Sequence, residues 1–405
     1  MKLTLLWISD SPHFPTGFGR TSGEILKRLS DVPDFDAHCL AIGGTPSLLH
    51  HEEGDYTVWH HPDPRPSKGS VMEIVRSVQP DVVVTLSNIW SAGYMEEITD
   101  ETGVKWVGYF PVDAGPLPAY FASVLERMDA RVTTSSFSAD VFRRSYPHLD
   151  VRIIRHGVDA GIFRPGSPAD GKPRLRNGDP AFVIGCVARN QPRKGLPTLV
   201  KAFSTFARSH PDAMLHLHTD PWDEEGWMLG ELLSRHGVED RTSFTQAMLR
   251  YESVDDEELR DIYRSFDVFA LPTMGEGFGL PILEAMACGV PVAATEGIAV
   301  SEMVGGRGEL IQIISTLTVP PHNFEAGLVD ADKLASALER LYENPGLRSK
   351  YARLGRKYAE GLTWDKSAEC WESLLRETVG KCYDEGNYGR ESDWRKDRSV
   401  RLTRL

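Results

Sequence analysis

At 405 residues, the chain is longer than one ordinary domain and suits two large α/β domains. Hydrophobic residues make up 41% of it and charged residues 25%, which excludes long disorder as its main organisation. The formal net charge of −13 argues against a protein that grips nucleic-acid phosphates over its whole surface, although it leaves room for a local basic groove.

The cysteines and the first residues indicate the cellular compartment in which the protein is expected. No cysteine pair has C-x-x-C or zinc-ligand spacing, so we expect free, mostly buried thiols in a reducing compartment. The first apolar run ends at Ser9 and Asp10, and is too short for a secretory signal. No stretch approaches the roughly 20 apolar residues of a membrane span. We therefore expect a cytoplasmic protein without a transmembrane segment. The cysteines are Cys39, Cys186, Cys288, Cys370 and Cys382.

The first part of the chain alternates strand patterns with helix patterns. A buried strand is predicted at 3–9, followed by a loop and a helix over 21–29. Strands that alternate with helices predict a parallel sheet covered on both faces. The further strands are predicted at 37–42, 81–86, 104–110, 130–134 and 151–154.

The alternation pauses at 157–180, which is rich in Gly, Pro and charge, as linkers are. A second α/β series then begins, and an amphipathic helix at 367–379 precedes a basic tail without periodicity. Strands of the second series are predicted at 182–188, 214–218, 267–271 and 290–294, and helices at 196–209, 256–265, 281–288 and 331–343.

The segment 267–302 carries the most chemistry. After a buried strand, Gly277 and Gly279 let the backbone turn sharply and approach a ligand closely. Pro281 suits the first turn of a helix, and Gly289 suits its left-handed cap. A Gly-rich loop therefore leads into the positive end of a short helix at the carboxyl edge of a parallel sheet. Anions and nucleotides bind at such places.

Two glutamates belong to this segment, Glu276 in the loop and Glu284 about one turn into the helix. Carboxylates beside a diphosphate would repel it, so their useful partners are hydroxyl groups. A nucleotide sugar supplies these on its ribose and on its transferred sugar. The alternative is a structural role, in which both glutamates only complement the helix N-terminus.

Residues 276–292, EGFGLPILEAMACGVPV, closely resemble the donor-site signature of the GT4 family of retaining glycosyltransferases. The resemblance implies the GT-B fold, an α/β architecture of two Rossmann-like, doubly wound parallel-sheet domains facing a central cleft. It also implies that Glu284 binds the ribose hydroxyls and Glu276 those of the donor sugar. The amides of Phe278, Gly279 and Leu280 would then lie against the diphosphate and the sugar.

The resemblance extends upstream, where Arg189 and Lys194 match the family's pair that neutralises the leaving diphosphate. An Arg fork and a Lys point charge suit the negative charge that accumulates as the glycosidic bond stretches. Glu302 matches a further acidic position, for which we expect a structural role. Met248 lies in the segment 245–249, which is expected to contact the donor base.

The likeness covers most of 150–375 and is weaker before that. The run 156–159 (HGVD) resembles the end of the family's first domain and is interpreted as hinge and packing, and Trp364 resembles the point where the chain returns to that domain. We therefore expect an acceptor-binding Rossmann-like domain at 1–165, a donor-binding one at 166–365, a helix crossing back at 366–385 and a basic tail at 386–405.

In the first half, Gly17, Phe18, Gly19 and Arg20 resemble the family's glycine loop, which faces the diphosphate across the cleft. A dinucleotide fingerprint is the rival interpretation, but it should follow the strand almost directly, whereas 10–16 intervene here.

Asp113 follows the predicted strand 104–110 at the cleft edge. Some family members place a His or an Asp here beside the reacting sugar, so Asp113 is a candidate catalytic residue. The alternative is a loop Asp that caps the next helix. The serines of 135–138 are expected to be helix caps first.

Two literal D-x-D strings, at 34–36 and 330–332, resemble the metal-binding pair of another transferase fold. The string at 34–36 precedes a strand, and the string at 330–332 suits a helix cap. The doublets at 50–51 and 60–61 lack ligand spacing. We therefore expect no metal.

The sequence thus predicts a retaining, metal-independent glycosyltransferase with a UDP- or GDP-sugar as co-substrate and no other cofactor. The first hypothesis for the acceptor is a hydroxyl of a saccharide, a lipid-linked sugar or a small molecule. The second is a 5-hydroxymethylpyrimidine base in DNA, because the opening residues 8–20 resemble transferases associated with bacteriophages and the tail is basic. A hypothesis of another class is a non-catalytic sugar-nucleotide-binding protein, which the intact motif disfavours.

Overall fold

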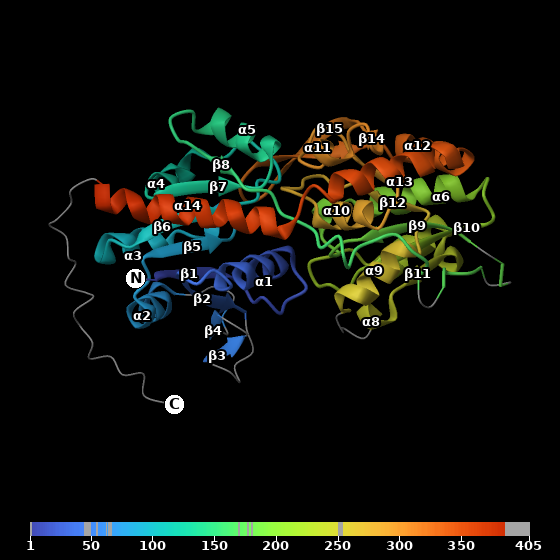
Figure 1. Cartoon of the computed structure of the whole chain (residues 1–405). Helices are drawn as coiled ribbons and strands as arrows, with labels where there is room; N and C mark the ends of the chain where they lie inside the picture. Colours follow the sequence, from blue (N-terminus) through green and yellow to red (C-terminus); the bar gives the residue numbers. More distant parts are fainter. Residues whose placement is uncertain are drawn as a thin grey trace.

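The computed structural model describes residues 2–43, 50–53, 56–61, 63, 67–168, 171–175, 178–179, 181–249 and 254–384, with the backbone alone at 50–53, 249 and 381–384. Two α/β halves lie side by side, the first blue to teal and the second green to orange in Figure 1. This arrangement of two sheets with flanking helices is the predicted architecture. The predicted basic tail at 386–405 lies outside the described residues.

The first sheet has the order β3-β4-β2-β1-β5-β6-β7-β8, and its neighbours pair in parallel except β3 with β4. All residues of β5 are buried, as expected of a parallel strand covered on both faces. The strands are β1 (Leu3–Asp10), β2 (Phe35–Ile42), β3 (His50–Glu53), β4 (Tyr56–His61), β5 (Val82–Leu86), β6 (Lys105–Tyr109), β7 (Ala130–Thr133) and β8 (Arg152–Ile153).

The helices of this half begin at side-chain caps. Helix α1 begins at Gly17 rather than at the predicted residue 21, because Thr16 Oγ1 accepts a hydrogen bond from Gly19 N at 3.0 Å. The predicted serine cap of α5 is confirmed, since Ser135 Oγ accepts from Ser138 N at 3.1 Å. The helical elements are α1 (Gly17–Ser30), α2 (Lys68–Val78), η1 (Ile89–Ser91), α3 (Tyr94–Thr102), η2 (Ala119–Phe121), α4 (Ala122–Glu126) and α5 (Ser136–Ser145).

The second sheet is parallel throughout its described strands, in the order β11-β10-β9-β12-β13-β14. Its strands are β9 (Phe182–Val187), β10 (Ala213–His218), β11 (Thr242–Phe244), β12 (Val268–Leu271), β13 (Val292–Thr295) and β14 (Glu309–Ile311). Its helical elements are η3 (Pro192–Lys194), α6 (Leu196–Ala207), α7 (Leu229–His236), η4 (Glu239–Arg241), α8 (Gln246–Leu249), α9 (Asp256–Arg264), α10 (Leu280–Ala287), α11 (Ser301–Val304), α12 (Ala331–Glu343) and α13 (Pro345–Ala359). The expected cap at 330 is confirmed, because Asp330 accepts from the first amides of α12.

A small antiparallel hairpin, β15 (Ile313–Val319) and β16 (Phe324–Val329), was not predicted. It pairs with neither large sheet, but Glu325 N donates to Gly115 O at 2.9 Å and Gly327 N to Met274 O at 2.7 Å. The hairpin therefore contacts both the first half and the loop 272–279 between β12 and α10, which is the predicted donor loop.

The chain returns to the first half after residue 362. Val158 N donates to Leu362 O at 2.9 Å, and α14 (Trp364–Asp384), the long red helix of Figure 1, lies along that half. Its Trp371 ring packs against Trp7 and Tyr109, with centroids 5.0 and 4.9 Å away. None of the helices in the described residues has the length and apolarity that a membrane crossing requires.

Candidate functional site

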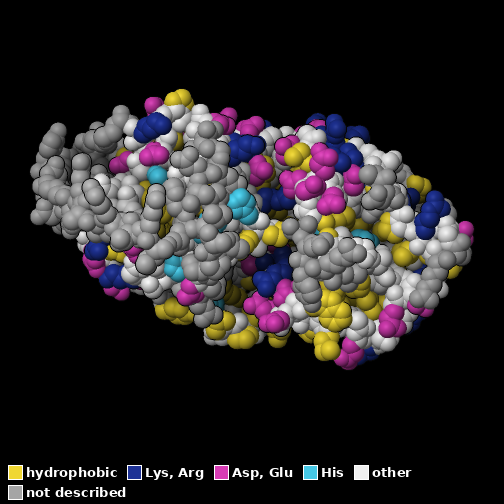
Figure 2. Space-filling model, turned by 90° about the horizontal axis from the view of Figure 1, so that it is seen from below, with side chains coloured by type: hydrophobic (Ala, Val, Ile, Leu, Met, Phe, Trp, Pro, Cys, Tyr) yellow, Lys and Arg dark blue, Asp and Glu magenta, His cyan; other side chains and the backbone are white. Residues whose placement is uncertain are grey.

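The loops at the carboxyl ends of several strands meet between the two halves. The strand order reverses at β1 in the first sheet and at β9 in the second, and ligands bind at such switch points in open α/β sheets. Across the halves, a Cβ on Gly277 would lie 2.5 Å from Pro111 Cβ. Figure 2 shows a hollow between the halves, where Lys and Arg side chains gather beside Asp and Glu side chains.

The loop between β12 and α10 has the predicted backbone geometry. Gly279 has a φ of +97°, a left-handed conformation that favours glycine, and Pro281 lies in the first turn of α10. Gly289, at a φ of +74°, follows the helix as predicted. The carbonyl of Gly277 accepts from Thr134 Oγ1 at 2.7 Å. The first half therefore helps to fix the loop whose amides, at 278–280, begin α10.

Glu276 is buried beside two cations. Lys194 Nζ donates to Glu276 Oε2 at 2.5 Å, and Arg193 Nη1 lies 3.3 Å from the same oxygen. Burial by itself would raise the pKa of Glu276, but Lys194 and Arg193 hold that pKa below its ordinary value. Burial, with the help of Arg193, lowers the pKa of Lys194, while Glu276 opposes this shift. Glu276 is therefore an ionised carboxylate.

Asp113 joins this cluster from the first half. It follows β6, and its Oδ2 lies 3.5 Å from Arg193 Nε. The Arg193 Nη1 also donates to the carbonyl of Gly275 at 3.0 Å. The next helical element, η2, begins after Pro118, so Asp113 does not cap it. The structure thus brings Asp113, Lys194 and Glu276 together through Arg193, a residue that sequence reasoning passed over.

Glu284 forms a second buried cluster. Its Oε2 accepts from Tyr263 Oη at 2.7 Å, and its Oε1 lies 3.1 Å from Arg20 Nη1, which comes from the first half. Arg20 Nη2 also pairs with Asp256 Oδ1 at 2.5 Å. Burial raises the pKa of Glu284, against the opposing effects of Arg20 and of the Tyr263 hydrogen bond. Arg20 therefore contacts a carboxylate of the other half.

Arg189 lies outside both clusters. Its Nε lies 2.7 Å from Asp223 Oδ2 and its Nη2 3.3 Å from Glu225 Oε2, and its side chain is 54% exposed. Burial raises the pKa of Asp10 at the end of β1, while a Thr16 hydrogen bond and the charge of Arg189 lower it. Arg189 thus faces the first half but is not brought beside Lys194.

The remaining predicted donor contacts are spread around the hollow. Gly17 and Phe18 open α1, and a Cβ on Gly19 would lie 2.5 Å from the carbonyls of both Phe14 and Ser11, so only glycine fits there. Phe278 is buried, Leu280 is the first residue of α10, and Met248 lies on α8.

His156, interpreted from the sequence as hinge and packing, lies beside the donor loop. Its ring centroid is 4.8 Å from that of Phe278, and both of its ring nitrogens are buried without a hydrogen-bond partner among the described atoms. Burial lowers its pKa to about 3, so the ring is neutral. The only sequence signal for this position is its place in the HGVD run.

Known proteins resemble this chain in sequence and in fold. Residues 181–344 match the family described as "Glycosyl transferases group 1". The lipopolysaccharide core biosynthesis mannosyltransferase LpsB of Rhizobium meliloti is 31% identical over 262 residues, which are 62% of this chain and 68% of the relative. The chain belongs to the group 1, GT4-type glycosyltransferases. The D-inositol 3-phosphate glycosyltransferase of Saccharomonospora viridis is 29% identical over 266 residues, 63% of this chain and 57% of the relative.

The chain spans only about half the length of the inositol phosphate relatives it matches, 57%, 49% and 53% in three of them. Two solved structures share its fold over nearly the whole chain. Sucrose-phosphate synthase from Thermosynechococcus elongatus has a TM-score of 0.76 at 18% identity, covering 94% of this chain and 100% of that one. Anabaena HepE with UDP and glucose has a TM-score of 0.70 at 17% identity, covering 93% and 100%. The predicted GT-B fold is confirmed.

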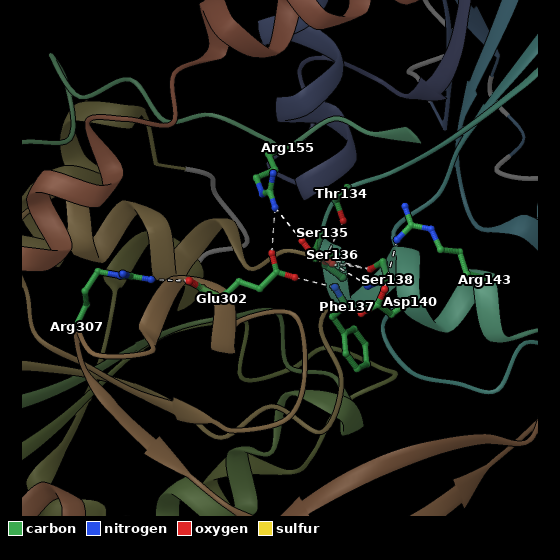
Figure 3. A network of polar contacts seen from close by, with 11 residues as sticks. Thr134, Ser135, Ser136, Phe137, Ser138, Asp140, Arg143, Arg155, Glu302 and Arg307 are labelled. Atoms are coloured by element: carbon green, nitrogen blue, oxygen red, sulfur yellow. Dashed lines mark hydrogen bonds and ion pairs between the residues drawn. The ribbon is translucent and has the colours of Figure 1, made fainter. Parts of the chain in front are cut away.

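Glu302, for which a structural role is expected, contacts the first half. Figure 3 shows its carboxylate between Arg155 and Phe137: Phe137 N donates to Oε1 at 2.7 Å, and Arg155 Nη2 lies 3.3 Å from Oε2. Arg155 Nη2 also donates to Ser136 Oγ at 2.9 Å. Glu302 of the second half therefore holds the first turn of α5 and the segment after β8.

Replacing Arg193 with glutamine should lower turnover about tenfold or more, because hydrogen bonds to charged groups contribute about 1.5–3 kcal/mol each. The substitution removes the cation between Asp113 and Glu276. Steady-state kinetics would check this, with Arg143→Gln as control, since Arg143 pairs with Asp140 on the exposed face of α5. Unchanged turnover in the Arg193 variant would show that Arg193 does not contribute to the reaction.

Proposed function

We propose that this chain is a retaining glycosyltransferase that uses a nucleotide sugar, with UDP as the favoured nucleotide. The observation that carries the proposal is the buried contact of Lys194 with Glu276 at the loop that begins α10. A cation, a carboxylate and the amides at the start of a helix at one place suit a diphosphate joined to a sugar. Solved structures of similar fold support the choice of UDP, since Anabaena HepE is described with UDP-glucose.

The proposed roles follow from these contacts. Glu284 holds the ribose hydroxyls, and Glu276 holds hydroxyls of the transferred sugar. Lys194, Arg189 and the amides of 278–280 neutralise the diphosphate, and the first turn of α1 at Gly17 faces it from the other half. Arg189 would exchange its carboxylate partners Asp223 and Glu225 for the diphosphate. Met248 is assigned to the nucleobase, and Asp113 to the reacting sugar.

The proposed reaction needs no carboxylate nucleophile. The bond between the anomeric carbon and the diphosphate oxygen breaks, and its electron pair stays on that oxygen. The acceptor hydroxyl attacks the same face of the sugar and gives its proton to the departing oxygen, so the configuration is retained. Lys194 and Arg189 stabilise the charge that develops on the diphosphate. Contact between the halves would keep water away from the donor.

For the acceptor, we propose the hydroxyl of a saccharide or small molecule. Relatives named D-inositol 3-phosphate glycosyltransferase and mannosylfructose-phosphate synthase support this class. A hydroxymethylated base in DNA is the alternative, and it would add demands that a sugar does not make: salt-sensitive phosphate contacts and the flipping of a base out of the duplex. We keep the cytoplasmic location as part of the proposal, because Cys186, Cys288 and Cys370 form no disulfide with a residue that the structure describes.

A thermal-shift screen with UDP-, GDP- and ADP-sugars tests the donor directly. A ligand at a hundred times its dissociation constant should add about 2.7 kcal/mol to the free energy of unfolding. We expect the UDP-sugars to raise the Tm most. If no nucleotide sugar raised the Tm, a donor site at 276–284 would be excluded.

We expect turnover to persist in excess EDTA, because Lys194 and Arg189 supply the positive charge that a divalent ion supplies elsewhere. The measurement is the initial rate of nucleotide release with and without EDTA, followed by addition of Mn²⁺ or Mg²⁺. Loss of activity with EDTA and its return with either ion would contradict metal independence.

A further inference from the structure

A cavity of about 380 Å³ lies between the two halves, beside the proposed reaction site. The first half contributes Pro116 and, from α5, Phe137, Val141 and Arg144. The second half contributes Ile298 and the hairpin residues Ile313, Thr316 and Glu325. The cavity is therefore complete only when both halves and the β15–β16 hairpin are in contact.

The cavity adjoins the cluster that Asp113, Arg193, Lys194 and Glu276 form. Its wall includes Ala114 and Gly115, which directly follow Asp113. The Asp113 Oδ1 would lie 3.1 Å from a Cβ on Gly277, in the donor loop. The hairpin is tied to the same loop by the hydrogen bond from Gly327 N to Met274 O at 2.7 Å. A molecule in this cavity would therefore lie next to the transferred sugar.

Contacts across the cleft fix the position of the hairpin. Tyr120 Oη lies 2.6 Å from His322 Nδ1, and the ring centroids of His322 and Trp90 are 4.4 Å apart. Both Tyr120 and Trp90 belong to the first half, while His322 lies in the hairpin turn. With the bond from Glu325 N to Gly115 O, these contacts make the hairpin a wall of the cleft.

The charged side chains of the wall indicate which kind of ligand the cavity binds. Arg144 lies in the last turn of α5 and makes no hydrogen bond or ion pair with a residue that the structure describes, whereas its neighbour Arg143 pairs with Asp140. The other charged residue of the wall, Glu325, accepts a hydrogen bond at Oε1 from Thr318 Oγ1 at 2.5 Å, and hydrogen bonds from threonine hydroxyls lower its pKa, so it remains a carboxylate on the hairpin side of the wall. Apolar side chains make up much of the remaining surface. The volume is near the lower end for small-molecule sites.

We propose that this cavity is the acceptor subsite and that it takes a small polyol or sugar carrying an anionic group, which Arg144 binds. This inference rests on the proposed function, because it assigns a binding site to the acceptor of the proposed glycosyl transfer. The apolar wall of Val141, Ile298 and Ile313 contacts the ring face of the acceptor, and one of its hydroxyls points to Asp113.

Calorimetry on the full chain tests this with D-inositol 3-phosphate, D-glucuronate and uncharged myo-inositol as probes, each with and without saturating UDP. The phosphate and carboxylate probes distinguish the two kinds of anion. We expect at least one charged probe to bind wild-type protein tenfold or more tightly than myo-inositol. Arg144→Gln should abolish this difference, whereas Arg143→Gln should preserve it. Equal binding of all three probes, or a difference that survives Arg144→Gln, would overturn the proposal.

A second substitution fills the cavity from its exposed side. Thr316 is exposed on β15 and lines the cavity, while Ser315 points to the opposite face of the strand. Thr316→Trp should abolish probe binding and leave UDP binding unchanged, and Ser315→Trp should change neither. Transfer to hydroxymethylated DNA that survives Thr316→Trp would also overturn the subsite. A wild-type protein that binds the probes but not UDP would instead contradict the proposed function alone.

Discussion

Lys194→Ala should lower turnover about a hundredfold or more while the protein still folds. The substitution removes one charge-assisted contact to a developing anion, worth on the order of 2–4 kcal/mol in the transition state. In the structure, Lys194 is buried and paired with Glu276, so its ammonium is fixed at the start of α10 before any ligand arrives. The rate of nucleotide release under saturating donor measures the effect.

Lys201→Ala is the matched control, because Lys201 is exposed on α6 and its loss should leave the rate unchanged. A circular dichroism spectrum and a Tm for each variant separate a lost fold from a lost contact. Since Arg193 still faces Glu276 after the substitution, the buried carboxylate keeps one cation. A near wild-type rate in a folded Lys194 variant would show that the diphosphate lies elsewhere.

Glu284→Gln and Glu276→Gln should impair different properties, the first mainly nucleotide affinity and the second mainly turnover. Glu284 is proposed to accept from the ribose hydroxyls, so Glu284→Gln should weaken the binding of free UDP about tenfold or more. Glu276 is proposed to contact the transferred sugar, which free UDP lacks. Glu276→Gln should therefore leave UDP affinity nearly unchanged and lower turnover about a hundredfold. Calorimetry with UDP and steady-state kinetics measure the two effects.

Both variants keep the size of the side chain and remove only its charge, so each is a control for the other. Glu284 also holds Tyr263 and Arg20, and Arg20 keeps Asp256 as a partner in the variant. Weaker UDP binding in Glu276→Gln, together with unchanged binding in Glu284→Gln, would reverse the two assignments.

The donor loop was predictable because its constraints are local. Pro281 and the glycines at 279 and 289 each fit one backbone position, and the structure has them at the helix start and at left-handed φ values. The buried strands were predictable for a similar reason, since each is a short apolar run between turn residues. The first residue of α1 was not predictable, because the cap at Thr16 starts the helix despite the two glycines, Gly17 and Gly19, in its first turn.

Contacts between distant residues could not be predicted. Arg193 reads as a surface charge in a loop, and only the packing of the two halves brings Asp113 beside it. Arg189 and Lys194 match one motif, yet the fold turns Arg189 toward Asp223 and Lys194 toward Glu276. The β15–β16 hairpin gave no clear alternation, because its Ile314 and Leu317 side chains are exposed.

The most direct test of the account is a crystal structure of the chain with UDP-glucose. We expect the diphosphate within hydrogen-bond distance of Lys194 Nζ and of the amides at 278–280, and the ribose hydroxyls at the carboxylate of Glu284. A diphosphate bound away from the start of α10, for example only along the first turn of α1, would contradict the central claim.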